Sequence, residues 1–261
     1  MSKPRVQAPM KRQSRRPDGK RRRTIYAVAL GLAIAVTAAV GVLVAVNGED
    51  APPPRSSTLP ESYADASPEL IEAAQDVGFY PRTSPGVGQI QDQPASAAQP
   101  PSNPNLLPVG SEAPAFTLET PTGNTVSLSD YRGKATLIEF FATWCPHCAA
   151  QAPHLVELAN SMDDSRFGFV SVNANGEDAA SVFAYEVHYG LPFPALLDPG
   201  PNPGSFSSPG SPGPVSTEYQ VAAYPTFYIV DPAGKITWRS DGEQPTALLR
   251  EELEKAAAGS P

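Results

Sequence analysis

The chain has 261 residues, 41% of them hydrophobic, and a formal net charge of −8 at pH 7. Residues 1–24 carry ten Lys or Arg against the single acid Asp18, whereas the other 237 residues carry nine basic and 26 acidic side chains. This strong negative charge on the larger part argues against binding to nucleic acid or to anionic lipid.

The first predicted element is a membrane anchor. Residues 25–46 read IYAVALGLAIAVTAAVGVLVAV, which is 22 residues without a charged side chain. At about 1.5 Å per residue, such a helix spans roughly 33 Å, enough for the hydrocarbon core of a bilayer. A cleaved signal peptide usually has a shorter apolar stretch and a small-residue cleavage site, so we favour an uncleaved anchor. The basic tail at 1–24 then keeps the N-terminus in the cytoplasm, which predicts that everything after the anchor lies outside the cell membrane.

Residues 47–108 are predicted to be a linker. They are rich in Pro, Ser, Ala and Gln and have no sustained apolar pattern, which is typical of a spacer between a membrane and a folded domain. Ser67 and Pro68 provide an N-cap and a first helical position for a short helix at 68–77. The sequence leaves open whether this helix docks on the domain, binds a partner or forms only transiently.

Residues 109–258 have the pattern of a packed domain. The predicted strands are a hairpin at 116–128, buried strands at 135–142 and 167–175, and a hairpin at 226–240. The predicted helices are 146–162, 177–190 and 245–258. This alternation predicts an α/β fold with a central mixed sheet flanked by helices. The Pro/Gly/Ser-rich stretch 198–216 is expected to be a surface insertion, with partner recognition as the alternative.

Both cysteines of the chain lie in FFATWCPHCAAQAP (140–153), as Cys145-Pro-His-Cys148. A structural zinc site needs four ligands, and the sequence has no second cysteine pair. Covalent haem attachment needs a histidine directly after the second cysteine, and position 149 is alanine. A disulfide across two residues constrains the unfolded chain little. The remaining interpretation is a dithiol that forms a Cys145–Cys148 disulfide and exchanges it, without a metal or cofactor.

The residues around the pair predict different roles for the two thiols. Cys145 precedes Pro146, a residue suited to the first helical position, and is therefore the predicted N-cap. Free backbone N–H groups and the helix dipole stabilise a thiolate there, so we assign Cys145 as the attacking thiol and Cys148 as the resolving thiol. His147 is expected to favour the thiolate further and so to make the disulfide a better oxidant.

Glu139 is a carboxylate inside the apolar run 135–142. Burial without a partner raises the pKa of such a group. An acid six residues before Cys145 is a candidate to take the proton from Cys148 when that thiol attacks the mixed disulfide. The alternative is a side chain that reaches water at the edge of the sheet.

These motifs resemble, in order, those of the thioredoxin superfamily, and within it the membrane-anchored TlpA/ResA-like, AhpC/TSA-redoxin-type branch. The resemblance covers about 109–258 and includes the stretches LIEFFATWCPHC and VAAYPTFYIV. It implies a thioredoxin-like fold and thiol-disulfide exchange on exported protein substrates, with a membrane redox partner that recycles the cysteines. It also implies that Pro225 is cis, that the backbone of Tyr224, Pro225 and Thr226 aligns the substrate chain, and that Trp144 contacts the substrate.

The direction of exchange stays open. The Pro-His dipeptide between the cysteines resembles that of DsbA, a thiol oxidase, whereas many TlpA/ResA-like relatives are reductants that serve cytochrome c maturation. A copper chaperone that binds Cu(I) through Cys145, His147 and Cys148 is the alternative from another class. A thiol peroxidase is disfavoured, because FATW before Cys145 does not resemble the peroxiredoxin signature.

Overall fold

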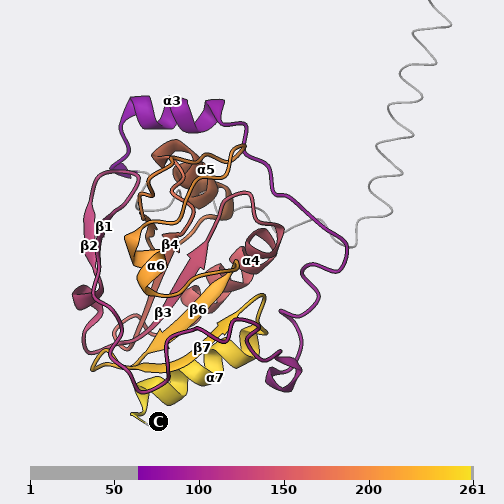
Figure 1. The fold of residues 1–261 in the computed structure, drawn as a ribbon, viewed down its shortest axis with the longest axis vertical. Helices are drawn as coiled ribbons and strands as arrows, with labels where there is room; N and C mark the ends of the chain where they lie inside the picture. Colours follow the sequence, from indigo (N-terminus) through magenta and orange to yellow (C-terminus); the bar gives the residue numbers. More distant parts are fainter. Residues whose placement is uncertain (1–63, 260–261) are drawn as a thin grey trace, which may run out of the picture. The chain divides into compact units, whose positions relative to one another are not determined.

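The computed structural model describes residues 64–259 (Figure 1). In this part of the chain no helix is long and apolar enough to cross a bilayer. The predicted anchor at 25–46 and the basic tail at 1–24 lie outside the described residues. Helices and a mixed sheet make up the described part, which confirms the predicted α/β class.

Seven strands form one sheet in the order β2-β1-β5-β4-β3-β6-β7 (Figure 1). The strands are Thr117–Glu119 (β1), Thr125–Ser127 (β2), Ala135–Phe141 (β3), Phe167–Asn173 (β4), Ala195–Leu197 (β5), Thr226–Val230 (β6) and Ile236–Asp241 (β7). The predicted hairpins are β1–β2 and β6–β7, both antiparallel. Strand β3 pairs in parallel with β4 and antiparallel with β6, so it lies inside the sheet.

The apolar runs that predict β3 and β4 are buried on both faces. Because side chains alternate along a strand, Leu137 points to one face of the sheet and Ile138 to the other, and they join different clusters of the core. Strand β5 has only three residues. Its short sequence carries too little pattern to have been predicted.

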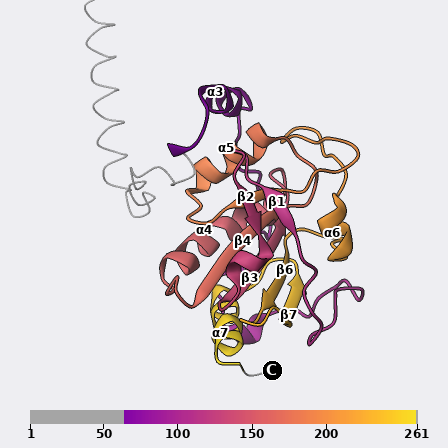
Figure 2. The same ribbon diagram turned by 90° about the vertical axis from the view of Figure 1, so that its left-hand side faces the viewer.

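The helices cover both faces of the sheet. They are Pro68–Asp76 (α3), Pro146–Asn160 (α4), Ala179–Tyr189 (α5), Pro214–Glu218 (α6) and Thr246–Ala257 (α7), with 3₁₀ turns at Ala95–Ala97 and Leu128–Tyr131. Figure 2 shows α4, α5 and α7 on one side of the sheet and α6 on the other. The core clusters agree, because α4, α5 and α7 contribute to the clusters of one face, and the residues around α6 contribute to that of the other.

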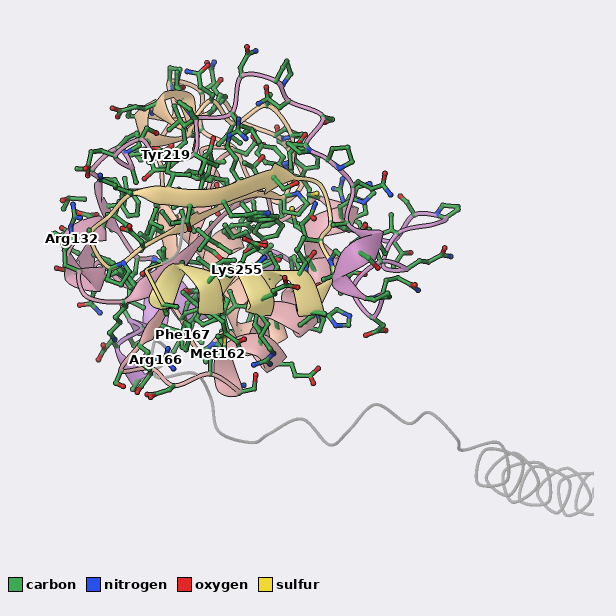
Figure 3. All side chains as sticks on the ribbon, turned by 90° about the horizontal axis from the view of Figure 1, so that it is seen from below. Arg132, Met162, Arg166, Phe167, Tyr219 and Lys255 are labelled. Carbon is green, nitrogen blue, oxygen red and sulfur yellow. The ribbon has the colours of Figure 1, made fainter. Side chains whose placement is uncertain are left out.

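Helix α7 shows why this face is stable. Its Leu249 and Leu253 are fully buried against the sheet, in the same cluster as Phe167. Lys255 lies on the outer side of the helix (Figure 3). Its Nζ pairs with Glu251 Oε1 at 2.8 Å. An apolar stripe inside and charges outside is the pattern of a helix that packs on a sheet.

Residues 81–108 lie on the domain, whereas the sequence predicts them as part of a linker. Leu106 is 3% exposed and packs in the core, and its carbonyl accepts a hydrogen bond from Arg239 Nε at 3.2 Å. Further along, the Ser102 backbone N–H donates to Asp241 Oδ1 at 2.6 Å. The folded part therefore includes a segment upstream of residue 109, which we call the extension (residues 81–108).

The short helix α3 leads into an aromatic contact with the domain. Ser67 Oγ accepts from the Leu70 backbone N–H, as expected for the N-cap. After the helix, the Phe79 ring lies 5.8 Å from that of Tyr185 on α5 and 4.9 Å from that of Phe206. The sequence left open whether this helix docks on the domain, binds a partner or forms only transiently. In the structure it is docked on the domain.

The stretch 198–216 is more than a surface loop. It contains the start of α6, where the Asp198 carboxylate accepts hydrogen bonds from Ser216 N at 2.7 Å and from Ser216 Oγ at 2.6 Å. Phe206 is 5% exposed, in contact with Phe79. The insertion is thus built into the fold by one buried ring and one buried carboxylate.

Candidate active site

Cys145 is the N-cap of α4, directly before Pro146, as the sequence predicts. Its sulfur accepts a hydrogen bond from the Cys148 backbone N–H at 3.3 Å and lies 3.6 Å from the Tyr224 carbonyl oxygen, to which the thiol can donate. The hydrogen bond from the Cys148 thiol is the largest cause that lowers the pKa of Cys145. The backbone N–H groups of Cys148 and His147 lower it further, against the effect of burial. This environment favours a thiolate on Cys145.

The pKa of the Cys148 thiol is shifted in the opposite direction. Its side chain is fully buried, and burial raises the pKa of its thiol well above the usual range. The negative charges that form on Cys145 and on Glu139 raise it further. The pair therefore holds one thiol ready to attack and one that stays protonated until a base assists it.

Glu139 lies in the middle of β3 and is 2% exposed, so the alternative of a side chain at the sheet edge is wrong. It shares a face of the strand with Leu137 and Phe141, which is the face that α4 and α5 cover. Burial raises its pKa to about 7, although Ser171 Oγ donates to Oε2 at 2.5 Å. Its Oε1 is buried and has no hydrogen-bond partner among the described residues.

His147 is more than half exposed, at the first turn of α4. Its Nδ1 contacts the Oε1 of Glu243, a residue of the loop between β7 and α7. No sequence pattern connects these two residues, because they lie 96 positions apart. Glu243 itself is held by the extension, with Gly88 N donating to Oε2 at 2.9 Å.

The loop before β6 faces the first cysteine. The Tyr224–Pro225 peptide bond is cis, as the family resemblance implies. The ring of Trp144 packs edge-on against that of Tyr224, with ring centroids 6.0 Å apart, and both rings are partly exposed. Thr226 is fully buried and its hydroxyl donates to the Ala223 carbonyl at 2.8 Å, so only the backbone contact that the resemblance implies stays a prediction for this residue. Trp144 and Tyr224 are the exposed candidates for substrate contact.

Two buried residues that no sequence motif predicts, Glu177 and Tyr185, hold the site in place. The Glu177 carboxylate accepts hydrogen bonds from the Thr143 backbone N–H at 2.8 Å and from Asn173 Nδ2 at 2.6 Å, which fixes the turn before Trp144. Tyr185 on α5 donates to the Cys148 carbonyl at 3.2 Å. The fold brings both residues to the site from distant parts of the sequence, so neither position could be predicted from a local motif. The one weak indication was that Glu177 closely follows two asparagines at the end of a predicted strand.

A cavity of about 720 Å³ opens beside the cysteines. The extension forms one side, and the loops before β6 and after β7 form the other. Its lining includes Gln89, Gln93, His147, Tyr224 and Gly242. The cavity is thus continuous with the site, because it shares His147 and Tyr224 with it.

Thiol-disulfide exchange follows from this arrangement in two balanced steps. The Cys145 thiolate attacks one sulfur of a substrate disulfide, forms a mixed disulfide and releases the other sulfur as a thiolate. Cys148 then loses its proton and attacks the Cys145 sulfur, which closes the Cys145–Cys148 disulfide and releases the second substrate thiol. In the reverse direction, a substrate thiolate attacks the Cys145 sulfur, and Cys148 leaves as a thiolate that then takes up a proton. The second substrate thiolate next attacks the substrate sulfur of the mixed disulfide, which oxidises the substrate and releases the Cys145 thiolate.

The fold and the asymmetric cysteine pair define a thiol-disulfide oxidoreductase of the thioredoxin superfamily. The profile of the AhpC/TSA family matches residues 109–239, and the chain belongs to this family. This match covers the cysteines, Glu139 and the cis-proline loop, but neither the extension up to 108 nor Glu243.

Curated relatives of the chain also include thiol-disulfide oxidoreductases. The chain is similar to thiol-disulfide oxidoreductase ResA of Bacillus subtilis strain 168, with 28% identity over 142 residues, 54% of this chain and 72% of the relative. Thioredoxin-like protein YneN of the same strain is 34% identical over 129 residues, 49% of this chain and 68% of the relative. A solved structure assigned as thiol:disulfide interchange protein DsbE from Chlorobium tepidum matches with TM-score 0.50 and 25% identity, over 58% of this chain and 99% of that one. The ResA-like, thioredoxin-like resemblance read from the motifs is confirmed.

Proposed function

We propose that this oxidoreductase works outside the cytoplasmic membrane, tethered by residues 25–46, and exchanges disulfides with exported proteins. The observation that carries the catalytic part is the contrast between the two cysteines. Cys145 has a lowered pKa and faces the Tyr224 carbonyl, whereas Cys148 is buried with a raised pKa. The tether and the location rest on the basic tail and the uncharged apolar run.

The proposed direction is oxidation of substrate thiols. A cysteine whose thiolate is stabilised makes the reduced form more stable and the disulfide a stronger oxidant. Here the Cys148 thiol and the N–H groups at the start of α4 stabilise the Cys145 thiolate. A membrane redox protein would then reoxidise the pair after each turnover.

The proposed substrate is an extended protein segment that carries a cysteine. The cavity offers amide side chains of the extension together with Tyr224, whose ring packs against that of Trp144. Amides can hydrogen-bond a polypeptide backbone whatever its sequence, and such a surface suits an enzyme with several protein substrates. The alternative of a copper chaperone has no observation in its favour, since residues 64–259 contain no cluster of three or more His, Cys, Asp or Glu placed to hold a metal.

The location is tested by labelling Cys145 in intact bacterial cells that produce the full chain. A membrane-impermeant thiol reagent should label the wild-type protein after mild reduction, and the labelled protein should sediment with membranes. Deletion of residues 1–46 should keep the protein in the cytoplasm and protect Cys145 from the reagent. The Cys145→Ser variant is the control for labelling at Cys148. Labelling that requires the cells to be broken first would contradict the proposed location.

A further inference from the structure

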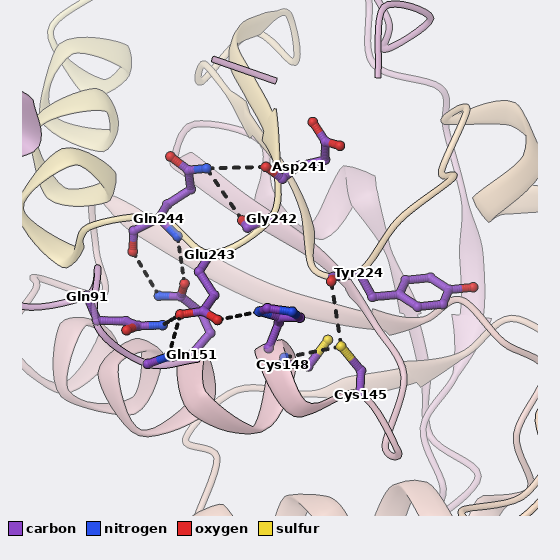
Figure 4. A network of polar contacts seen from close by, with 11 residues as sticks. Gln91, Cys145, Cys148, Gln151, Tyr224, Asp241, Gly242, Glu243 and Gln244 are labelled. Carbon is purple, nitrogen blue, oxygen red and sulfur yellow. Dashed lines mark hydrogen bonds and ion pairs between the residues drawn. The ribbon is translucent and has the colours of Figure 1, made fainter. Parts of the chain in front are cut away.

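Glu243 brings together three parts of the chain that are distant in sequence. Its Oε2 accepts hydrogen bonds from Gly88 N at 2.9 Å and from Gln91 Nε2 at 2.5 Å, and its Oε1 contacts His147 Nδ1. Figure 4 shows Glu243 between Gln91 and the two cysteines. The Glu243 side chain is 8% exposed, so it is largely shielded from water where it lines the cavity.

The position of this carboxylate is fixed from two sides. The Gln91 carbonyl accepts the Thr246 backbone N–H at 2.9 Å, and Gln91 is 1% exposed. On the other side, the Gln244 backbone N–H donates to Gln151 Oε1 at 2.9 Å, which ties the loop of Glu243 to α4. A buried carboxylate that is paired and hydrogen-bonded in this way keeps one geometry, because each lost partner would leave a buried polar group unsatisfied.

The fixed carboxylate of Glu243 in turn constrains the His147 ring. A carboxylate at Nδ1 fixes the tautomer and the orientation of the ring and leaves Nε2 as the second site for a proton. The His147 backbone N–H already favours the Cys145 thiolate. The contact with Glu243 holds the His147 side chain, and with it this N–H, at the first turn of α4. Neither the Glu243 carboxylate nor the His147 ring figures among the charges that act on Cys145, so the effect of Glu243 is expected to pass through the position of the His147 backbone N–H.

We propose that Glu243 is a positioning residue that holds the His147 ring for the cysteine pair, and that the extension, through Gly88 and Gln91, holds Glu243. The oxidising strength of the site would then depend on a segment outside the region matched by the family. This inference rests on the proposed oxidising function of the pair. It assigns to the extension a role in catalysis beyond that of a spacer.

The test is the reduction potential of the full chain in detergent, equilibrated against glutathione buffers. Glu243→Gln should lower the equilibrium constant for oxidation of glutathione about tenfold, a fall of about 30 mV in potential. His147→Ala should give a shift in the same direction, and Glu243→Gln should add nothing in the His147→Ala background. This absence of additivity is the signature of a residue that acts through another.

Two further variants separate positioning from charge and from folding. Glu243→Asp keeps the charge but is shorter by one methylene, so it should also lower the potential. Glu157→Gln removes an exposed carboxylate from the same helix as His147 and should leave the potential unchanged. The inference would be overturned if neither Glu243 variant changed the reduction potential. It would also be overturned if Glu243→Gln shifted the potential equally in the wild type and in the His147→Ala background. Wild-type protein without any exchange activity would instead overturn the proposed function.

Discussion

Replacement of Cys145 by Ser is expected to abolish disulfide exchange, leaving insulin reduction by dithiothreitol at its uncatalysed rate. The reason is that a hydroxyl at the N-terminus of α4 is not a nucleophile toward sulfur, and that buried Cys148 does not replace Cys145. Cys148 has no exposed surface and a pKa raised well above the usual range. Insulin turbidity with matched protein concentrations measures the effect.

The Cys148→Ser variant is expected to behave differently, because Cys145 can still attack but nothing resolves the product. It should accumulate mixed disulfides with substrate proteins, visible as higher bands on non-reducing gels that collapse with reductant. The double Ser variant is the control and should show none. Normal turnover by Cys145→Ser, or trapping by Cys145→Ser rather than by Cys148→Ser, would reverse the assignment of the two thiols.

Glu139→Gln is expected to slow the step in which Cys148 attacks the mixed disulfide by about a hundredfold, the lower end of the range for general base catalysis. Only the carboxylate form accepts a proton, and burial raises the pKa of Glu139 to about 7. The rate of this step in the wild type should therefore rise with pH through about 7, and that rise should disappear in Glu139→Gln. Rapid-quench measurement of the decay of a preformed mixed disulfide follows this step directly.

The stability of the same variant provides a check on the fold. Because the pKa of Glu139 is higher in the folded state than the ordinary 4.5, the folded state holds the proton more tightly. The resulting stabilisation is complete below about pH 4.5 and is lost as the pH rises through about 7, a loss of roughly 3 kcal/mol. The free energy of unfolding of Glu139→Gln should thus fall less than that of the wild type between pH 5 and 8.

A second buried acid serves as the matched control for the decay of the mixed disulfide. Glu186 on α5 is 2% exposed, and burial raises its pKa to about 8. Its carboxylate accepts the Ala195 backbone N–H at 2.9 Å, and it is not among the charges that affect the cysteines. Glu186→Gln should leave the decay of the mixed disulfide and its pH dependence unchanged. If Glu186→Gln and Glu139→Gln slowed the decay of the mixed disulfide equally, the effect of Glu139 would come from the stability of the fold and not from proton transfer.

Local pattern was sufficient to predict the parts of the site that lie close together in the sequence. The apolar run before Cys145 predicts β3, and Pro146 predicts the start of α4 with Cys145 as its N-cap, as the structure shows. Glu139 was predictable for the same reason, because one carboxylate in such a run has few ways to avoid burial. These inferences need only strand alternation, helix capping and the cost of burying charge.

Contacts between distant segments were not predictable in this way. The contact of His147 with Glu243 spans 96 positions, and that of Gly88 with Glu243 spans 155. The extension docks largely through hydrogen bonds to backbone and carboxylate groups, with Leu106 as its buried apolar anchor. Such polar docking leaves no hydrophobic periodicity, so a Pro/Gln-rich sequence looks like a linker even where it is part of the folded structure.

The measurement that tests the central claim most directly is the reduction potential of the Cys145–Cys148 pair in the full chain. If the environment of Cys145 stabilises its thiolate as the structure indicates, the potential should lie above about −200 mV, toward the −120 mV of the most oxidising thioredoxin-like proteins. The pair would then donate disulfides to exported proteins. A potential near the roughly −270 mV of thioredoxin, or below it, would contradict the proposed direction and indicate a reductant.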